Sequence, residues 1–204
     1  MEGFRSIHQQ TARRVFACRT LIGMGGVLVG LLIVHPGRYG ALNCWAVKAA
    51  SLLLVALGLG LRAWAVAFAG HHTRTNKIEA PQLVTDGPYA HVRNPIYLGT
   101  IILGLGMVGF LGDPLLLPIY ALTLAASFVG IIPAEERFLQ CQFGEEYSRY
   151  RAAVRRLIPR WRPWSGARRK IPDWSAARGE LVIAALLVVI ILLSHAAFFL
   201  KSRI

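Results

Sequence analysis

The chain has 204 residues, of which 55% are hydrophobic and 16% are charged, and its formal net charge is +13. A soluble domain does not need so much apolar material, so the composition indicates a membrane protein. The basic residues lie between long apolar runs, as in membrane proteins, which argues against a nucleic-acid partner. The Arg-rich stretch 149–170 leaves a nucleic-acid-binding arm as an alternative.

The three cysteines give no sign of a metal site or of a disulfide framework. Cys18, Cys44 and Cys141 lie far apart and show no CxxC spacing. A cleavable signal is not expected either, because the first apolar run begins after Ala17 and is long enough to span a membrane.

Five apolar runs approach the length of about 20 residues that crosses a bilayer core. They are residues 18–34, 44–69, 96–111, 114–132 and 181–200. The third and fourth should form a tight hairpin around Gly112-Asp113-Pro114. We therefore expect an all-α integral membrane protein with five spans, forming a single domain over residues 1–204.

A polar segment between the fourth and fifth runs carries apolar residues at helical spacing. They are Phe138, Leu139, Phe143, Tyr147, Tyr150, Val154, Leu157 and Ile158. This pattern predicts a cytoplasmic amphipathic helix, which lies on anionic headgroups, closes over a site, or does both.

The distribution of Lys and Arg predicts the orientation. With five spans, eighteen of the 23 basic residues fall on one side and three on the other, and Lys48 and Arg62 lie within the second run. Because basic residues collect on the cytoplasmic side, we expect a multi-pass protein with a cytoplasmic N-terminus and an external C-terminus.

Two polar stretches next to short spans are candidates for a site. In the first, residues 83–97, Gly87-Pro88 predicts a turn and Asn94-Pro95 opens the third span. The second is Pro133-Ala134-Glu135-Glu136. Its carboxylates are disfavoured if the fourth span ends there, and favoured if Pro133 begins a new helix. Either way they need partners, for which Arg93 and Arg137 are candidates.

The motifs LVTDGPYAHVRNPIYLG and PAEERFLQCQFGEEYSRYRAAVRRLIP, separated by a short hairpin, carry a resemblance. This arrangement, over residues 62–159, resembles the isoprenylcysteine carboxyl methyltransferase and phospholipid methyltransferase family of integral membrane enzymes. The resemblance implies methyl transfer from S-adenosyl-L-methionine without a Rossmann domain, and the chain has no strand–GxGxxG–helix unit.

The resemblance also implies a cofactor site built by the two polar stretches. The matching positions are Pro81, Gln82, Leu83, Val84, Tyr89, Asn94, Pro95, Ile96, Tyr97 and Glu135. Many family members have His where this chain has Asn94, whose amide cannot take up a proton. Glu136 is a candidate base, and Arg93 is a further candidate catalytic residue.

A second departure from the family concerns the acceptor. The isoprenylcysteine branch has a substrate-linked arginine four residues before the first Glu of the pair, where this chain has Ile131. Arg62 inside the second span is a candidate replacement, because an intramembrane arginine is often functional, although it can equally snorkel to the headgroups.

The sequence thus predicts methylation of a lipophilic acceptor at the cytoplasmic membrane face, the acceptor being a lipid amine or a thiol. The alternatives are carboxyl methylation of a prenylated cysteine, a sterol-reductase-like oxidoreductase, and a non-catalytic transport or scaffold protein. The expected partners are the bilayer and the acceptor, and no obligate protein partner is evident.

Overall fold

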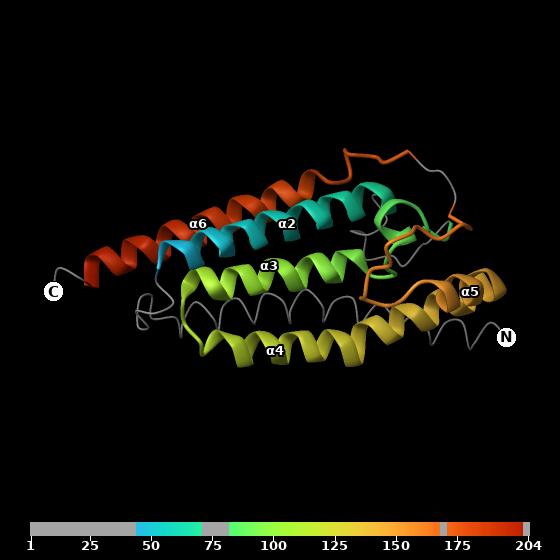
Figure 1. The fold of residues 1–204 in the computed structure, drawn as a ribbon, viewed down its shortest axis with the longest axis horizontal. Coiled ribbons are helices and arrows are strands. Elements are labelled where there is room, and N and C mark those ends of the chain that lie inside the picture. Colours follow the sequence, from blue (N-terminus) through green and yellow to red (C-terminus); the bar gives the residue numbers. More distant parts are fainter. Residues whose placement is uncertain (1–43, 71–81, 168–170, 202–204) are drawn as a thin grey trace, which may run out of the picture.

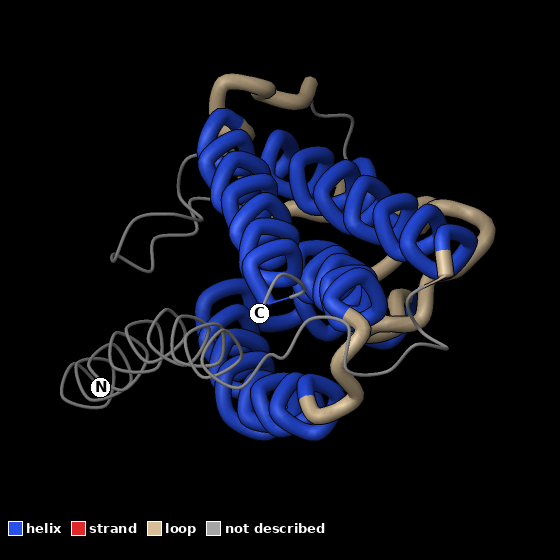
Figure 2. Tube along the Cα trace, turned by 90° about the vertical axis from the view of Figure 1, so that its left-hand side faces the viewer, coloured by secondary structure: helices blue, strands red, loops and turns tan. Residues whose placement is uncertain are grey.

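The computed structural model describes residues 44–70, 82–167 and 171–201, and all regular structure in these ranges is helical (Figures 1 and 2). The elements are α2 (Trp45–Ala69), the 3-10 helix η3 (Gly87–Ala90), α3 (Pro95–Leu111), α4 (Leu116–Ala126), the π-helical turn η4 (Ser127–Ile131), α5 (Ile132–Ala153) and α6 (Arg178–Lys201). The expectation of helical structure is confirmed for this part of the chain. The first expected span, 18–34, and Cys18 lie outside it.

Helices α2, α3, α4 and α6 run side by side along the long axis of the molecule (Figure 1). By length and composition, α2 and the continuous helix Leu116–Ala153 could each cross a membrane, while α3 is apolar but shorter. Large apolar side chains on the outside of these helices are exposed, including Leu53, Leu122 and Leu186. Water-facing surfaces rarely carry so many of them, so this surface suits a bilayer.

Glycines bring the backbones of α2 and α3 into direct contact. A Cβ atom on Gly58 would lie 2.5 Å from the Leu103 nitrogen and 2.7 Å from the Gly99 oxygen. Small residues of this kind drive close helix packing where no hydrophobic effect acts between helices. On α3, Gly99 also leaves room for the side chain of Arg62, whose Cγ would be 2.7 Å from an added Cβ.

The expected hairpin between α3 and α4 is confirmed. Gly112 ends α3 in the left-handed conformation, with φ of 67°, and its N–H bonds to the Val108 carbonyl. The buried Asp113 side chain accepts a hydrogen bond of 3.0 Å from the Leu115 N–H. The turn is therefore fixed by backbone conformation and by one side-chain cap.

The transition from α4 to α5 resolves the alternatives for the paired carboxylates. Pro133 has no N–H and its ring crowds the carbonyl four residues earlier, so the preceding turn widens into η4. Pro133 lies at the start of α5 and Glu135 in its first turn. Because Leu116–Ala153 is one continuous helix, neither alternative holds: no free helix end lies at the carboxylates, and they depend on their side-chain partners.

The amphipathic segment is shorter than the sequence pattern predicted. Helix α5 ends at Ala153, so Val154, Leu157 and Ile158 follow it in extended and bent structure. The helix is also broken internally at Gly144, whose φ of 50° and ψ of −119° are not helical. The apolar spacing carried no information about where the helix stops.

Residues 154–167, called the strap below, fold back against residues 90–94. The backbones are joined by four hydrogen bonds of 2.9–3.2 Å, which run from Arg93 N to Arg155 O, Asn94 N to Arg156 O, Arg160 N to His91 O and Trp164 N to Ala90 O. The strap also closes a buried cluster of Leu83, Tyr147, Tyr150 and Val154. Both polar stretches and the strap meet at one end of the bundle, the polar end (Figure 1).

Candidate functional site

The adjacent carboxylates Glu135 and Glu136 face different partners at the polar end. Successive residues of an α-helix point about 100° apart. Glu135 and Glu136 can therefore contact different partners from the same helical turn. The hydroxyl of Tyr97 on α3 donates a hydrogen bond of 2.9 Å to Glu135 Oε1. Glu136 instead turns toward arginines from the loop before α3 and from the strap.

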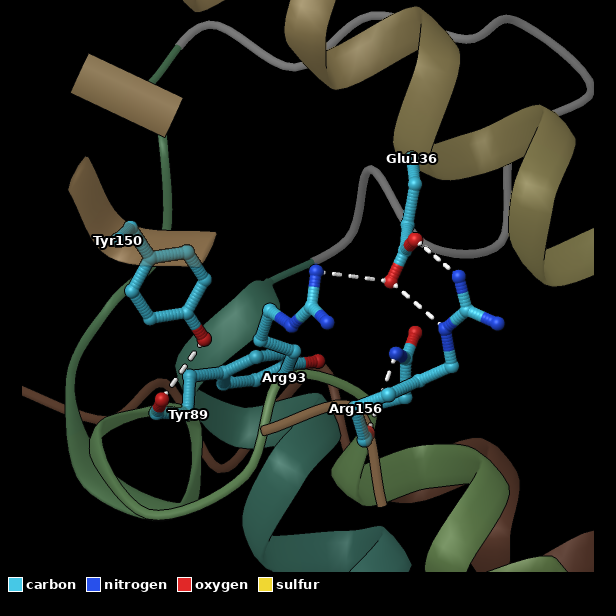
Figure 3. A network of polar contacts seen from close by, with 6 residues as sticks. Tyr89, Arg93, Glu136, Tyr150 and Arg156 are labelled. Atoms are coloured by element: carbon cyan, nitrogen blue, oxygen red, sulfur yellow. Dashed lines mark hydrogen bonds and ion pairs between the residues drawn. The ribbon is translucent and has the colours of Figure 1, made fainter. Parts of the chain in front are cut away.

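Glu136 lies between two guanidinium groups (Figure 3). Arg156 donates to both of its oxygens, at 3.1 and 2.6 Å, and Arg93 Nη1 lies 3.1 Å from Oε1. The Glu136 residue is only 6% exposed. With both oxygens engaged by arginines, the arrangement is that of a structural ion pair, not of a base facing a substrate. The prediction of Arg93 as a partner is confirmed, whereas the Arg137 side chain bonds to the Pro133 carbonyl.

Tyr89 lies at the same end of the bundle and is influenced by the charge of Glu135. Its carbonyl accepts a hydrogen bond of 2.7 Å from the Tyr150 hydroxyl (Figure 3). Burial raises the pKa of the Tyr89 phenol well above its ordinary value, the nearby Glu135 charge raises it further, and Arg62 opposes them. The Tyr89 hydroxyl therefore keeps its proton at neutral pH and remains a hydrogen-bond donor.

Arg62, which lies within the apolar helix α2, is held by α6. Its Nε and Nη2 donate to Glu180 Oε2 and Oε1 at 2.9 and 3.1 Å, a parallel two-bond pair. Its Nη1 donates to the hydroxyl of Thr100 on α3. Three helices, α2, α3 and α6, thus meet at one guanidinium group, and snorkelling is not needed to explain its charge.

The remaining predicted site residues lie around these groups. Asn94 donates from its side chain to the Arg156 carbonyl at 3.2 Å. Leu83 and Pro95 are buried, Val84 and Ile96 are half-buried, and Gln82 is exposed. Ile131 is buried one turn before Glu135, while Pro81 lies outside the described residues. The structure therefore brings Tyr89, Tyr97, Glu135 and Arg62 together, and leaves Gln82 at the surface.

Sequence reasoning missed two residues that complete the polar groups, Arg156 and Glu180. Arg156 was one of many arginines in a basic segment, and nothing local marks it as the partner of Glu136. Glu180 is an acidic residue at the start of an apolar run, a position that the helix dipole explains on its own. The one signal that could have indicated Glu180 is the need of Arg62, an arginine within an apolar helix, for a carboxylate partner.

Comparison with known proteins shows which proteins the chain is similar to. Residues 47–146 match the phospholipid methyltransferase family. A protein-S-isoprenylcysteine O-methyltransferase of Schizosaccharomyces pombe is 35% identical over 116 residues, covering 55% of this chain and 49% of the relative. The corresponding protein of Rattus norvegicus is 36% identical over 116 residues, covering 55% and 41%. Protein-S-isoprenylcysteine O-methyltransferase A of Arabidopsis thaliana is 32% identical over 132 residues, covering 63% and 66%.

The chain spans about half the length of the first of these relatives. No solved structure matches it. The family match begins two residues inside α2 and contains η3, α3, α4, η4, both carboxylates and most of α5. It ends before the strap and α6. The matched segment therefore resembles a phospholipid methyltransferase domain, and the chain is similar to protein-S-isoprenylcysteine O-methyltransferases.

Proposed function

We propose that this protein is an S-adenosylmethionine-dependent methyltransferase that modifies a lipophilic acceptor at the membrane face. One observation carries the proposal: Glu135, bonded to Tyr97 and close to Tyr89, lies at the polar end of an apolar bundle within the family match. The names of the relatives support methyl transfer.

The residues at the polar end fit the methyl donor. A carboxylate such as Glu135 accepts strong hydrogen bonds from hydroxyl or amino groups of a nucleoside. The aromatic faces of Tyr89 and Tyr97 suit a cationic sulfur. Among the described residues, Arg93 Nε is a buried donor without a hydrogen-bond acceptor, and a bound carboxylate would supply one.

When bound, S-adenosylmethionine supplies a methyl group on a positively charged sulfur. The acceptor would take this methyl group, sulfur would keep the electrons of the broken bond, and an amine or thiol acceptor would release one proton to water. Such a displacement depends mainly on orientation and on exclusion of water. We assign Glu136 a positioning role, in place of the base suggested by the sequence, because it fixes Arg93 and the strap.

The acceptor we propose is neutral before transfer, a lipid amine or a thiol. The buried Ile131 carries this proposal, because a carboxylate acceptor would need a cation where the side chain is apolar. Carboxyl methylation of a prenylated cysteine is the second candidate, favoured by the relatives' names.

We further propose five spans with the N-terminus in the cytoplasm and the C-terminus outside. In support, the loop 82–94 and the strap share one end of the bundle, and α6 runs from that end to the other (Figure 1). A reporter fused after Ile204 should therefore behave as external, and one inserted near the exposed Ser165 as cytoplasmic. Finding both reporters on one side would contradict this topology.

The cofactor proposal predicts weaker binding when Glu135 or Tyr97 is altered. Glu135→Ala removes a charged acceptor and should weaken S-adenosylmethionine binding by roughly tenfold or more, since a hydrogen bond to a charged group contributes about 1.5–3 kcal/mol. Tyr97→Phe, which leaves Glu135 in place, should have a smaller effect. Isothermal titration calorimetry of the purified chain in detergent measures both.

Glu145→Ala provides the matched control, because Glu145 is an exposed carboxylate on the same helix α5. It should bind the cofactor like the unaltered chain. Equal affinity in Glu135→Ala and in this control would show that the cofactor does not contact Glu135. Absence of binding by the unaltered chain would reject the methyltransferase proposal itself.

A further inference from the structure

Glu180 stands at the start of α6, outside the segment that matches the family. Its residue is 6% exposed, and its two oxygens hold Nε and Nη2 of Arg62. The third guanidinium nitrogen, Nη1, is bonded to Thr100. Each nitrogen of the Arg62 guanidinium group therefore already makes a bond within the protein, and its charge is balanced by a carboxylate.

This ion pair lies beside the candidate site. Thr100 follows Tyr97 by three residues, which places both on one face of α3. Tyr97 binds Glu135, and Ile131 precedes Glu135 by one turn of the helix. The charge of Arg62 also acts on the Tyr89 hydroxyl, as does that of Glu135. The ion pair is thus close enough to influence what binds next to Glu135.

The arginines at this end of the bundle fall into two groups, and only one of these groups is neutral. Glu136 holds Arg93 and Arg156, and Glu180 holds Arg62. Glu136 neutralises only one of its two arginines, and Arg93 is the residue proposed above to meet the carboxylate of the bound cofactor. A carboxylate on the acceptor would therefore need a further cation, because an unpaired buried charge is strongly disfavoured. Ile131 supplies none. Arg62 is the basic residue of α2 closest to the site, and Glu180 already neutralises its charge.

We propose that Glu180 determines acceptor specificity: by neutralising and orienting Arg62 it excludes carboxylate acceptors, and loss of its charge converts Arg62 into a carboxylate-binding residue. This inference rests on the proposed methyl transfer. Glu180 acts through Arg62 and is a positioning residue. If Glu180 had a purely structural role, removing its charge would lower activity in general. The specificity role instead predicts that the variant gains activity toward a new acceptor.

The test compares two acceptors with the same prenyl tail, farnesyl thiol and an S-farnesyl carboxylate, using the full chain in detergent with radiolabelled methyl donor. The unaltered chain should prefer the thiol. Glu180→Gln keeps a hydrogen-bonding amide next to Arg62 but removes the charge, and should lower KM for the carboxylate by roughly tenfold or more. The double variant Arg62→Gln/Glu180→Gln should lose this gain, and Glu145→Gln should match the unaltered chain.

Three results would overturn the inference. They are an unaltered chain that methylates the carboxylate as readily as the thiol, no change of preference in Glu180→Gln, and an equal gain in the double variant. If Glu180→Gln is not recovered folded, the double variant is tested alone. It lacks both charges and should still prefer the thiol, and a gain of activity toward the carboxylate in this variant would overturn the inference. Cofactor binding is measured separately by calorimetry, so a failure of the methyltransferase proposal is seen before acceptors are compared.

Discussion

Glu136→Ala should destabilise the protein more than any other single change at the polar end. It leaves Arg93, largely buried, and Arg156 without their shared counter-ion. Breaking a buried ion pair by removing one partner costs about 3–5 kcal/mol, which corresponds to a fall of roughly 10 °C in the unfolding midpoint. Thermal unfolding of the detergent-solubilised chain measures the change.

Two further variants test the reason for this loss. Glu136→Gln retains hydrogen-bonding atoms and should destabilise the chain less than alanine does. Glu145→Ala removes an exposed carboxylate from the same helix and should change stability by no more than about 0.5 kcal/mol. Equal midpoints for Glu136→Ala and Glu145→Ala would mean that the two arginines do not depend on Glu136.

Gly58→Ala should destabilise the protein, whereas Gly60→Ala, two residues further along α2, should not. A Cβ on Gly58 would lie 2.5 Å from the Leu103 nitrogen, whereas a Cβ on Gly60 meets nothing within 4 Å. The contact at Gly58 is with backbone, which yields only if α2 and α3 separate. We expect a loss of about 1–3 kcal/mol from overpacking.

Gly60→Ala should be neutral or stabilise the chain by up to about 1 kcal/mol, because alanine favours the helix more than glycine does. The pair is compared by unfolding midpoint and by size-exclusion profile in one detergent. Equal behaviour of the two variants would show that α2 and α3 do not pack through Gly58. A lower unfolding midpoint for Gly60→Ala alone would mean that Gly60, and not Gly58, lies on the face of α2 that packs against another helix.

Much of the bundle was predictable because lipid imposes simple rules on sequence. Long apolar runs indicated α2, α3 and α6 to within a few residues, and Gly112-Asp113-Pro114 indicated the hairpin. The end of α5 was not predictable, because apolar spacing continues past Ala153 into the strap. Gly144 could be seen, but only the backbone shows that it adopts a non-helical conformation.

The candidate site was predictable where its partners are close in sequence or marked by a motif. The pairing of Arg93 with the carboxylates is an example. The contacts of Glu136 with Arg156 and of Arg62 with Glu180 depend on how the strap folds back and where α6 begins. Many arginines in the basic segment offered the same charge, so composition could not choose among them. The backbone hydrogen bonds of the strap to residues 90–94 place Arg156, and not another arginine, next to Glu136.

The distance in sequence between Arg62 and Glu180 has a consequence for how the protein is made. Glu180 follows Arg62 by 118 residues. At a synthesis rate of about 5–20 residues per second, Glu180 is synthesised roughly 6–24 s after Arg62. During that interval its long side chain can reach the headgroups, and the later arrival of α6 draws it between the helices. A chain that stops before α6 leaves this arginine without its carboxylate partner, which physically distinguishes unfinished molecules from complete ones.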